Sequence, residues 1–146
     1  MGIDYKSKAA LYFAQGFSCS QSVLAAFSED LGLDSVTALK IGCGFGAGCA
    51  RTGQTCGAVT GAYVVIGLKH GKAEPEDSDS REKTYAMVSE FNRRFLDAYN
   101  SLNCTELTGF FLGDSAEYQK AAESGVFEIT CMGIIEKSAA ILQDIL

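Results

Sequence analysis

Proline occurs only once in this chain, which leaves long stretches free to form helices. Pro75 lies in the polar segment KAEPEDSDS (residues 72–80), near the middle of the sequence. Because proline disrupts a helix interior, a chain whose one proline lies in an evident loop can be helical on both sides of it. With 146 residues, the usual size of one domain, the sequence predicts a single all-α domain, a helical bundle over residues 1–146.

Helical spacing of apolar residues and capping signals mark the expected helices. Ser or Asp precedes several apolar runs and glycine follows several of them, as at helix starts and ends. The same signals place a short helix start at Asn103, three residues before Glu106, in the pattern of a capping box. The longer expected helices cover residues 5–15, 18–31, 34–41, 55–69, 80–100, 114–124 and 130–146.

Two of these segments carry most of the expected core. Residues 55–69 are apolar on nearly every face, which predicts a buried central helix, although their β-branched residues would also suit a strand. One face of this helix has only small residues, which would let another backbone approach closely, from the core or from a second copy in a homodimer. The helix over 80–100 carries a stripe that we assign to the core: Tyr85, Val88, Phe91, Phe95 and Tyr99.

Charge and hydropathy exclude two classes of partner from the expected function. The formal charge is −6 with no basic stripe, so nucleic-acid binding is not expected. The longest apolar run, residues 62–68, is too short to span a membrane. The N-terminal residues lack the apolar core of a secretory signal, and we expect a cytoplasmic location.

Cysteine is abundant and unevenly distributed. Three of the six cysteines lie in the glycine-rich stretch GCGFGAGCARTGQTCGAVTG (residues 42–61), which we expect to form a tight loop over 42–53 that leads into the central helix. In a reducing cytosol, this many thiols indicate metal or redox chemistry more often than structural disulfides. No C-x-x-C or C-x-x-C-H occurs, so a thioredoxin-type pair, a zinc ribbon and covalent haem are not expected. A site would have to be assembled from distant residues.

Four cysteines follow a residue type that commonly caps a helix. This places them in the first turn of four separate helices, where the free amides and the helix dipole favour thiolate over thiol. The alternative is that they are small buried core residues. Cys43 and Cys49 differ, because glycine precedes both. The four pairs are Ser18–Cys19, Thr55–Cys56, Asn103–Cys104 and Thr130–Cys131.

Arg51 is the only cation in the glycine-rich stretch. A guanidinium there could offset the negative charge of nearby thiolates, or it could bond loop carbonyls. The segment GFGAG lacks the G-x-x-x-x-G-K-[ST] pattern of a phosphate-binding loop, so nucleotide binding is not expected.

The cysteine order resembles a known family. Cys19, the hexapeptide CGAVTG (residues 56–61), Cys104 and Cys131 are similar to the redox-active family named for a C…C-G-A-x-x-G…C…C pattern. The resemblance extends from about residue 17 to the final helix. It implies a small helical protein with a redox role, and a similar domain in split-Soret cytochromes carries an iron–sulfur cluster beside haem. Cys43 and Cys49 lie outside this pattern.

Taken with the residues, the resemblance predicts a redox or electron-transfer protein, or a thiol- or iron–sulfur-based oxidoreductase. Its four family cysteines would ligate an iron–sulfur cluster or form dithiol/disulfide pairs, with Gly57 and Arg51 beside the cofactor. In the thiol form, Cys56 is the expected attacking sulfur, because its helix start is well supported. An electron donor and acceptor are implied but not identified by any motif. The alternatives are a structural zinc-binding or adaptor protein and a helical interaction module with passive, buried cysteines.

Overall fold

A computed structural model describes residues 4–146, so the first three residues of the predicted domain lie outside the described part of the chain. These residues form an all-α fold without strands, apart from one isolated bridge between Thr55 and Asn103. The all-α prediction is confirmed, and residues 57–70 of the expected central segment are helical rather than extended. The helices are α1 (Tyr5–Ala14), α2 (Cys19–Ser28), α3 (Ser35–Gly42), α4 (Gly46–Cys49), α5 (Gly57–His70), α6 (Ser78–Tyr99), α7 (Cys104–Thr108), α8 (Ser115–Ser124) and α9 (Met132–Ile145). Shorter turns are η1 (Glu29–Leu31), η2 (Cys43–Phe45) and the π-helical turn η3 (Phe127–Cys131).

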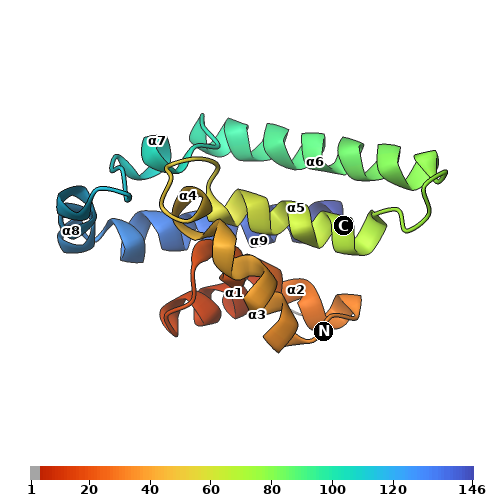
Figure 1. Cartoon of the computed structure of the whole chain (residues 1–146), viewed down its shortest axis with the longest axis horizontal. Coiled ribbons are helices and arrows are strands. Elements are labelled where there is room, and N and C mark those ends of the chain that lie inside the picture. Colours follow the sequence, from red (N-terminus) through yellow and green to blue (C-terminus); the bar gives the residue numbers. More distant parts are fainter. Residues whose placement is uncertain (1–3) are drawn as a thin grey trace.

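Helices α5 and α9 lie at the centre of the molecule (Figure 1). Helix α6 covers one side of them, and the group α1, α2 and α3 covers the other. The short helices α4, α7 and α8 gather at one end, on the left of Figure 1. A buried hydrogen bond joins the two central helices: the Ser138 hydroxyl of α9 donates to the Ala58 carbonyl of α5 at 2.8 Å. Within residues 4–146, no helix combines the length and apolarity needed to cross a bilayer.

The core stripe expected on α6 is only partly buried. Phe91 and Phe95 are fully buried and stack at 5.9 Å between ring centroids, whereas Tyr85 is 61% exposed. Assigning Tyr85 to the core was therefore wrong. The reason is geometric: each residue turns a helix by about 100°, so two successive three-residue steps rotate Tyr85 by about 120° away from Phe91.

The small-residue face of α5 packs closely against α2, so the close approach that the sequence predicts is made within the chain. A methyl group added to Gly61 would lie 2.9 Å from the Ser20 carbonyl oxygen, and one added to Gly57 would lie 3.0 Å from the Ser20 amide nitrogen. The two backbones can approach this closely only because neither glycine has a side chain. This face is therefore occupied within the chain, and it gives no basis for a homodimer.

The Gly61→Ala substitution tests this contact. We expect it to lower the free energy of unfolding by about 1–3 kcal/mol, because α2 and α5 would have to move apart. Gly67→Ala is the control on the same helix, since a methyl group there meets nothing within 4 Å. It should raise stability by about 0.5–1 kcal/mol by restricting the unfolded chain. Urea unfolding followed by circular dichroism measures both, and equal effects would contradict the close packing of α2 on α5.

Candidate functional site

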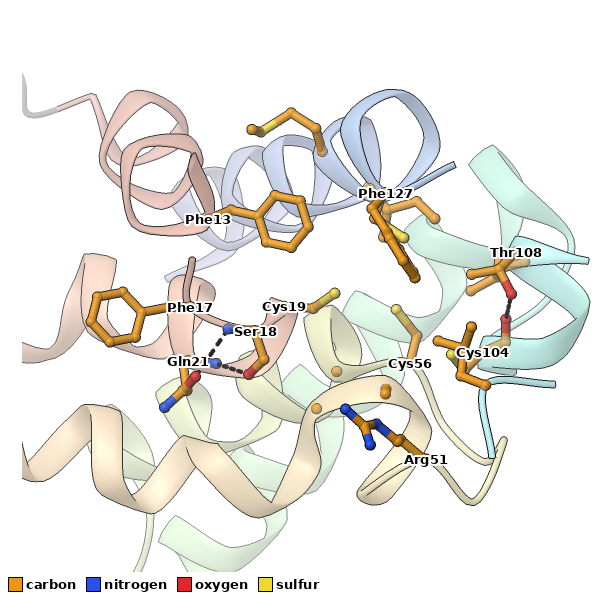
Figure 2. A pocket seen from close by; sticks show the side chains of 18 of the residues that line it. Phe13, Phe17, Ser18, Cys19, Gln21, Arg51, Cys56, Cys104, Thr108 and Phe127 are labelled. Atoms are coloured by element: carbon orange, nitrogen blue, oxygen red, sulfur yellow. Dashed lines mark hydrogen bonds between the residues drawn. The ribbon is translucent and has the colours of Figure 1, made fainter. Parts of the chain in front are cut away.

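A cavity of about 870 Å³ lies where α2, α5 and α7 begin and η3 ends. We call it the thiol cavity, because its lining includes Cys19, Cys56, Cys104 and Cys131. Figure 2 shows the sulfurs of Cys19 and Cys56 pointing toward its centre. All six cysteines are free thiols. The structure thus brings together the four cysteines that the sequence singles out.

The start of α2 places Cys19 as predicted. The Ser18 hydroxyl accepts from the Gln21 amide at 3.4 Å, and the Gln21 side-chain oxygen accepts from the Ser18 amide at 2.9 Å. This reciprocal pair is the capping box that the sequence indicates. Because the cap fixes where the helix begins, Cys19 lies in the first turn of α2 at the edge of the cavity.

Cys56 and Cys104 are held together by backbone hydrogen bonds. The Cys56 amide donates to the Leu102 carbonyl at 2.8 Å, and the Cys104 amide donates to the Gln54 carbonyl at 2.7 Å. These two bonds flank the isolated bridge between Thr55 and Asn103. The segments before α5 and α7 are therefore antiparallel, and both helices begin at the same wall of the cavity.

Of the two helix caps predicted beside these cysteines, the structure confirms Asn103 and contradicts Thr55. The Asn103 side chain accepts from the Glu106 amide at 3.0 Å and caps α7, as expected. However, the Glu106 carboxylate bonds the Ser101 hydroxyl at 2.8 Å, so the capping box is incomplete. Thr55 does not cap α5, because Cys56 itself occupies the N-cap position. The Cys56 sulfur faces the amides of Ala58 and Val59.

Cys131 does not begin a helix, so that prediction was wrong. Its backbone is helical (φ −65°, ψ −39°) and continues from η3 into α9 without a break. Thr130 cannot cap, because the residues before it are already helical. The π-helical turn positions Cys131 instead. Such turns widen the helix locally and are frequent at functional sites.

Burial sets the protonation of the two thiols on the α5–α7 wall. It raises the pKa of Cys56 to about 12 and that of Cys104 to about 11. For Cys56, the facing amides of Ala58 and Val59 lower the pKa by less than burial raises it. Cys56 is therefore a neutral thiol at pH 7 and a poor nucleophile, contrary to its expected attacking role.

Cys19 and Cys131 form an asymmetric pair. The interaction between their side chains raises the pKa of Cys19 and lowers that of Cys131. In Cys19, burial adds to the increase. Of the two, Cys131 is therefore the thiol more easily converted to thiolate.

The neutral buried thiols predict a loss of stability in alkali. In the unfolded chain, cysteine ionises near pH 8.5, whereas the folded protein keeps Cys56 and Cys104 protonated until about pH 12 and 11. The stability of the metal-free, reduced protein is therefore retained below pH 8.5 and falls above it. We expect a loss of roughly 4 kcal/mol between pH 7.5 and 10, about 2 kcal/mol from each thiol. Urea unfolding measures it, and Cys56→Ala should lose about half as much as the wild-type protein loses; the same loss in both would contradict the assignment.

The remaining two cysteines occupy different surroundings. Cys43 follows α3 and is exposed at the rim of the cavity. Cys49 is half-buried in a left-handed turn in which Ala47, Gly48, Cys49, Ala50 and Arg51 have φ between 57° and 69°. The expected tight loop over 42–53 is thus built from the end of α3, η2 and this turn.

The left-handed turn is unusual and is packed against the site. Four of its five residues are not glycine, and each costs roughly 1–2 kcal/mol in this conformation. Gly48 is the position where only glycine fits, because an added methyl group would lie 2.7 Å from the Cys104 β-carbon. The Ala50 amide bonds the Gly46 carbonyl at 2.7 Å, and the Gln54 amide bonds the Gly48 carbonyl at 3.0 Å. Backbone strain of this kind clusters at functional sites.

Gly57 and Arg51 both line the cavity. A methyl group on Gly57 would lie 3.1 Å from the Cys19 β-carbon, so this glycine leaves room for the thiol. Arg51 is exposed, and its guanidinium lies 5.0 Å from the centre of the Tyr118 ring. Sequence reasoning missed the aromatic wall formed by Tyr118 and Phe127, because neither residue belongs to a recognisable motif.

Among residues 4–146, no three Cys, His, Asp or Glu side chains are grouped closely enough to hold a single metal ion. The four thiols line one cavity without surrounding one point.

A family model described as "Putative redox-active protein (C_GCAxxG_C_C)" matches residues 17–145. The chain belongs to this family. Its members are thus described as redox-active, which agrees with the resemblance of the cysteine pattern. Searches of curated proteins and of solved structures gave no match.

The name of the family differs in one detail from the pattern on which the resemblance rests. Its letters read G-C-A-x-x-G, which occurs in this chain as GCARTG (residues 48–53), whereas C-G-A-x-x-G occurs as CGAVTG (residues 56–61). The name therefore draws attention to Cys49 as well as Cys56. Both are close enough to Cys104 to repel its thiolate, since Cys49 raises the pKa of Cys104 and Cys104 raises that of Cys56. Cys56 lines the thiol cavity, and Cys49 is not among its lining residues.

Proposed function

We propose that this protein is a redox protein that uses Cys19, Cys56, Cys104 and Cys131 as one set. The observation that carries the proposal is that these four thiols, from the starts of three helices and a π-helical turn, line a single cavity. Three of them, Cys56, Cys104 and Cys131, are buried, with a relative exposure of 6% each. A buried thiol set with an opening to solvent suits electron exchange with a partner.

An iron–sulfur cluster is the first form of this site. Four cysteine thiolates are a complete ligand set for a [2Fe–2S] or [4Fe–4S] cluster. Cationic iron would offset the burial that keeps Cys56 and Cys104 protonated, and Gly57 and Arg51 would lie beside the cluster. A single zinc ion would need four sulfurs about 2.3 Å from one point, so it would require these side chains to move closer together.

A dithiol/disulfide couple is the second form, supported by the proximity of Cys19 and Cys131, whose thiols shift each other's pKa. The Cys131 thiolate would attack a disulfide substrate, forming a mixed disulfide and releasing one substrate thiolate. The Cys19 thiol, after losing its proton, would then attack the Cys131 sulfur and release the second. The protein pair would lose two electrons, and the substrate disulfide would gain them.

Anaerobic purification, followed by a visible spectrum and analysis for iron, sulfide and zinc, tests the proposal. Iron and sulfide in equal amounts, with absorption that bleaches on reduction, would support the cluster form. A metal-free protein whose thiols titrate as a pair against redox buffers of known potential would support the dithiol form. Zinc without colour would indicate a structural site. Six unreactive thiols and no metal would exclude every redox form.

A further inference from the structure

We infer that the thiol cavity also binds a flat conjugated organic molecule that carries an anionic group, with that group at Arg51. This inference rests on the proposed function, because it names the class of electron-exchanging molecule that the redox site would meet. Its first support is volume: about 870 Å³ lies within the range of sites for small organic molecules, about 300–1,000 Å³. Thiols occupy only part of the lining.

Aromatic side chains from separate elements form the wall above the thiols. Phe13 of α1, Phe17, Tyr118 of α8 and Phe127 of η3 all line the cavity. Figure 2 shows the rings of Phe13 and Phe127 beside the space toward which the Cys19 and Cys56 sulfurs point. Because aromatic rings stack favourably on other flat rings, this wall favours a conjugated ligand over an aliphatic one.

Arg51 extends the aromatic wall to the rim. Its guanidinium lies over the Tyr118 ring at 5.0 Å, and that ring packs against Phe127 at 5.6 Å between centroids. Within residues 4–146, no carboxylate forms an ion pair with Arg51. Its donors therefore remain available to an anion, and the planar guanidinium suits a carboxylate, sulfonate or phosphate.

A second charged residue in the cavity lining, Glu128, determines how the proposed ligand would be oriented. Glu128 is the carboxylate among the lining residues, and it is exposed and close enough to disfavour the Cys131 thiolate. An anionic group would be repelled near Glu128 and attracted near Arg51. The ligand ring would then extend from Arg51 along Tyr118 and Phe127, toward the thiols.

A matched pair of fluorescent probes tests this inference on the protein as purified. 8-Anilinonaphthalene-1-sulfonate and N-phenyl-1-naphthylamine differ only by the sulfonate group. We expect the sulfonate to bind at one site per chain and about tenfold more tightly than the neutral probe, the effect of one hydrogen bond to a charged group. Anthraquinone-2-sulfonate should displace it. Equal affinities for the two probes, or no saturable binding, would overturn the inference.

Substitutions of Arg51 test whether the sulfonate probe binds at this residue. Arg51→Gln should remove the preference for the sulfonate, whereas Arg51→Lys should keep most of it. Arg81→Gln is the control with the same change of charge, because Arg81 lies on α6 and does not line the cavity. A sulfonate preference that survives Arg51→Gln in a folded protein, or disappears equally in Arg81→Gln, would overturn the assignment to Arg51.

The binding readout is independent of redox function. A protein that holds iron and sulfide, or titrates as a dithiol, but binds neither probe would refute only the inference about the ligand. A protein that binds the sulfonate at Arg51 but has six unreactive thiols and no metal would refute only the proposed function.

Discussion

Cys131→Ser is expected to abolish redox activity in both proposed forms of the site. In the cluster form it removes one of four ligands, and in the dithiol form it removes the thiolate that attacks. The loss should exceed the roughly 10–100-fold effect of removing a residue that only supports a ligand. Iron and sulfide content, together with a redox titration of the thiols, measures it. Serine is close to cysteine in size, so circular dichroism should show an unchanged fold.

Three further serine substitutions separate the alternatives. Cys56→Ser should abolish the cluster but leave a Cys19–Cys131 couple intact, so it distinguishes the two forms. Cys43→Ser, at the exposed rim of the cavity, should leave both the cluster and the dithiol couple intact. Cys49→Ser compares the two motif assignments: cofactor loss equal to that of Cys56→Ser would make Cys49 a member of the set and would contradict the division of the six cysteines argued above.

Phe91→Ala is expected to be the most destabilising of the substitutions considered for the fold. The Phe91 ring is fully buried, stacks on Phe95 and meets Tyr63 edge-on at 6.4 Å. Removing it should leave a cavity and lower the free energy of unfolding by about 3–5 kcal/mol, a large part of the 5–15 kcal/mol typical of such a domain. Urea unfolding at neutral pH measures the effect.

Tyr85→Ala is the matched control for Phe91→Ala. Both residues lie on α6 and belong to the same stripe in the sequence, but Tyr85 is 61% exposed. We expect its removal to change stability by less than about 0.5 kcal/mol. Comparable losses at the two positions would show that Tyr85 is buried after all, in contradiction to the structure.

Local signals predicted those parts of the fold that depend on neighbouring residues. Ser18, Asp34, Asn103 and Asp114 cap the helices that their side chains indicate, since a cap needs only a side chain and an amide a few residues on. The close approach at Gly61 was also predictable, because a face without side chains leaves space for a neighbour. Its occupant was not, since sequence alone does not distinguish α2 from a second copy.

Long-range contacts decided what the local signals could not. Thr130 has the chemistry of a cap, but residues from Phe127 onward are already helical, and the π-helical turn rather than a cap positions Cys131. Cys56 is at a helix start that would favour a thiolate, but burial outweighs the effect of the facing amides. The five left-handed residues 47–51 carry no sequence signal, because four of them are not glycine.

By itself, the sequence determined that this chain is helical and that it belongs to a family described as redox-active, and it singled out the four cysteines that line the cavity. Those properties follow from helix caps, the spacing of apolar residues and the order of the cysteines. All three can be read from neighbouring residues or from residue order along the chain. Only the tertiary structure decided that the four thiols share one cavity, that Cys131 rather than Cys56 is favoured as a thiolate, and that Arg51 stands free at the rim beside an aromatic wall. Proximity, burial and the pKa of a thiol depend on residues far apart in sequence, so packing alone could settle them.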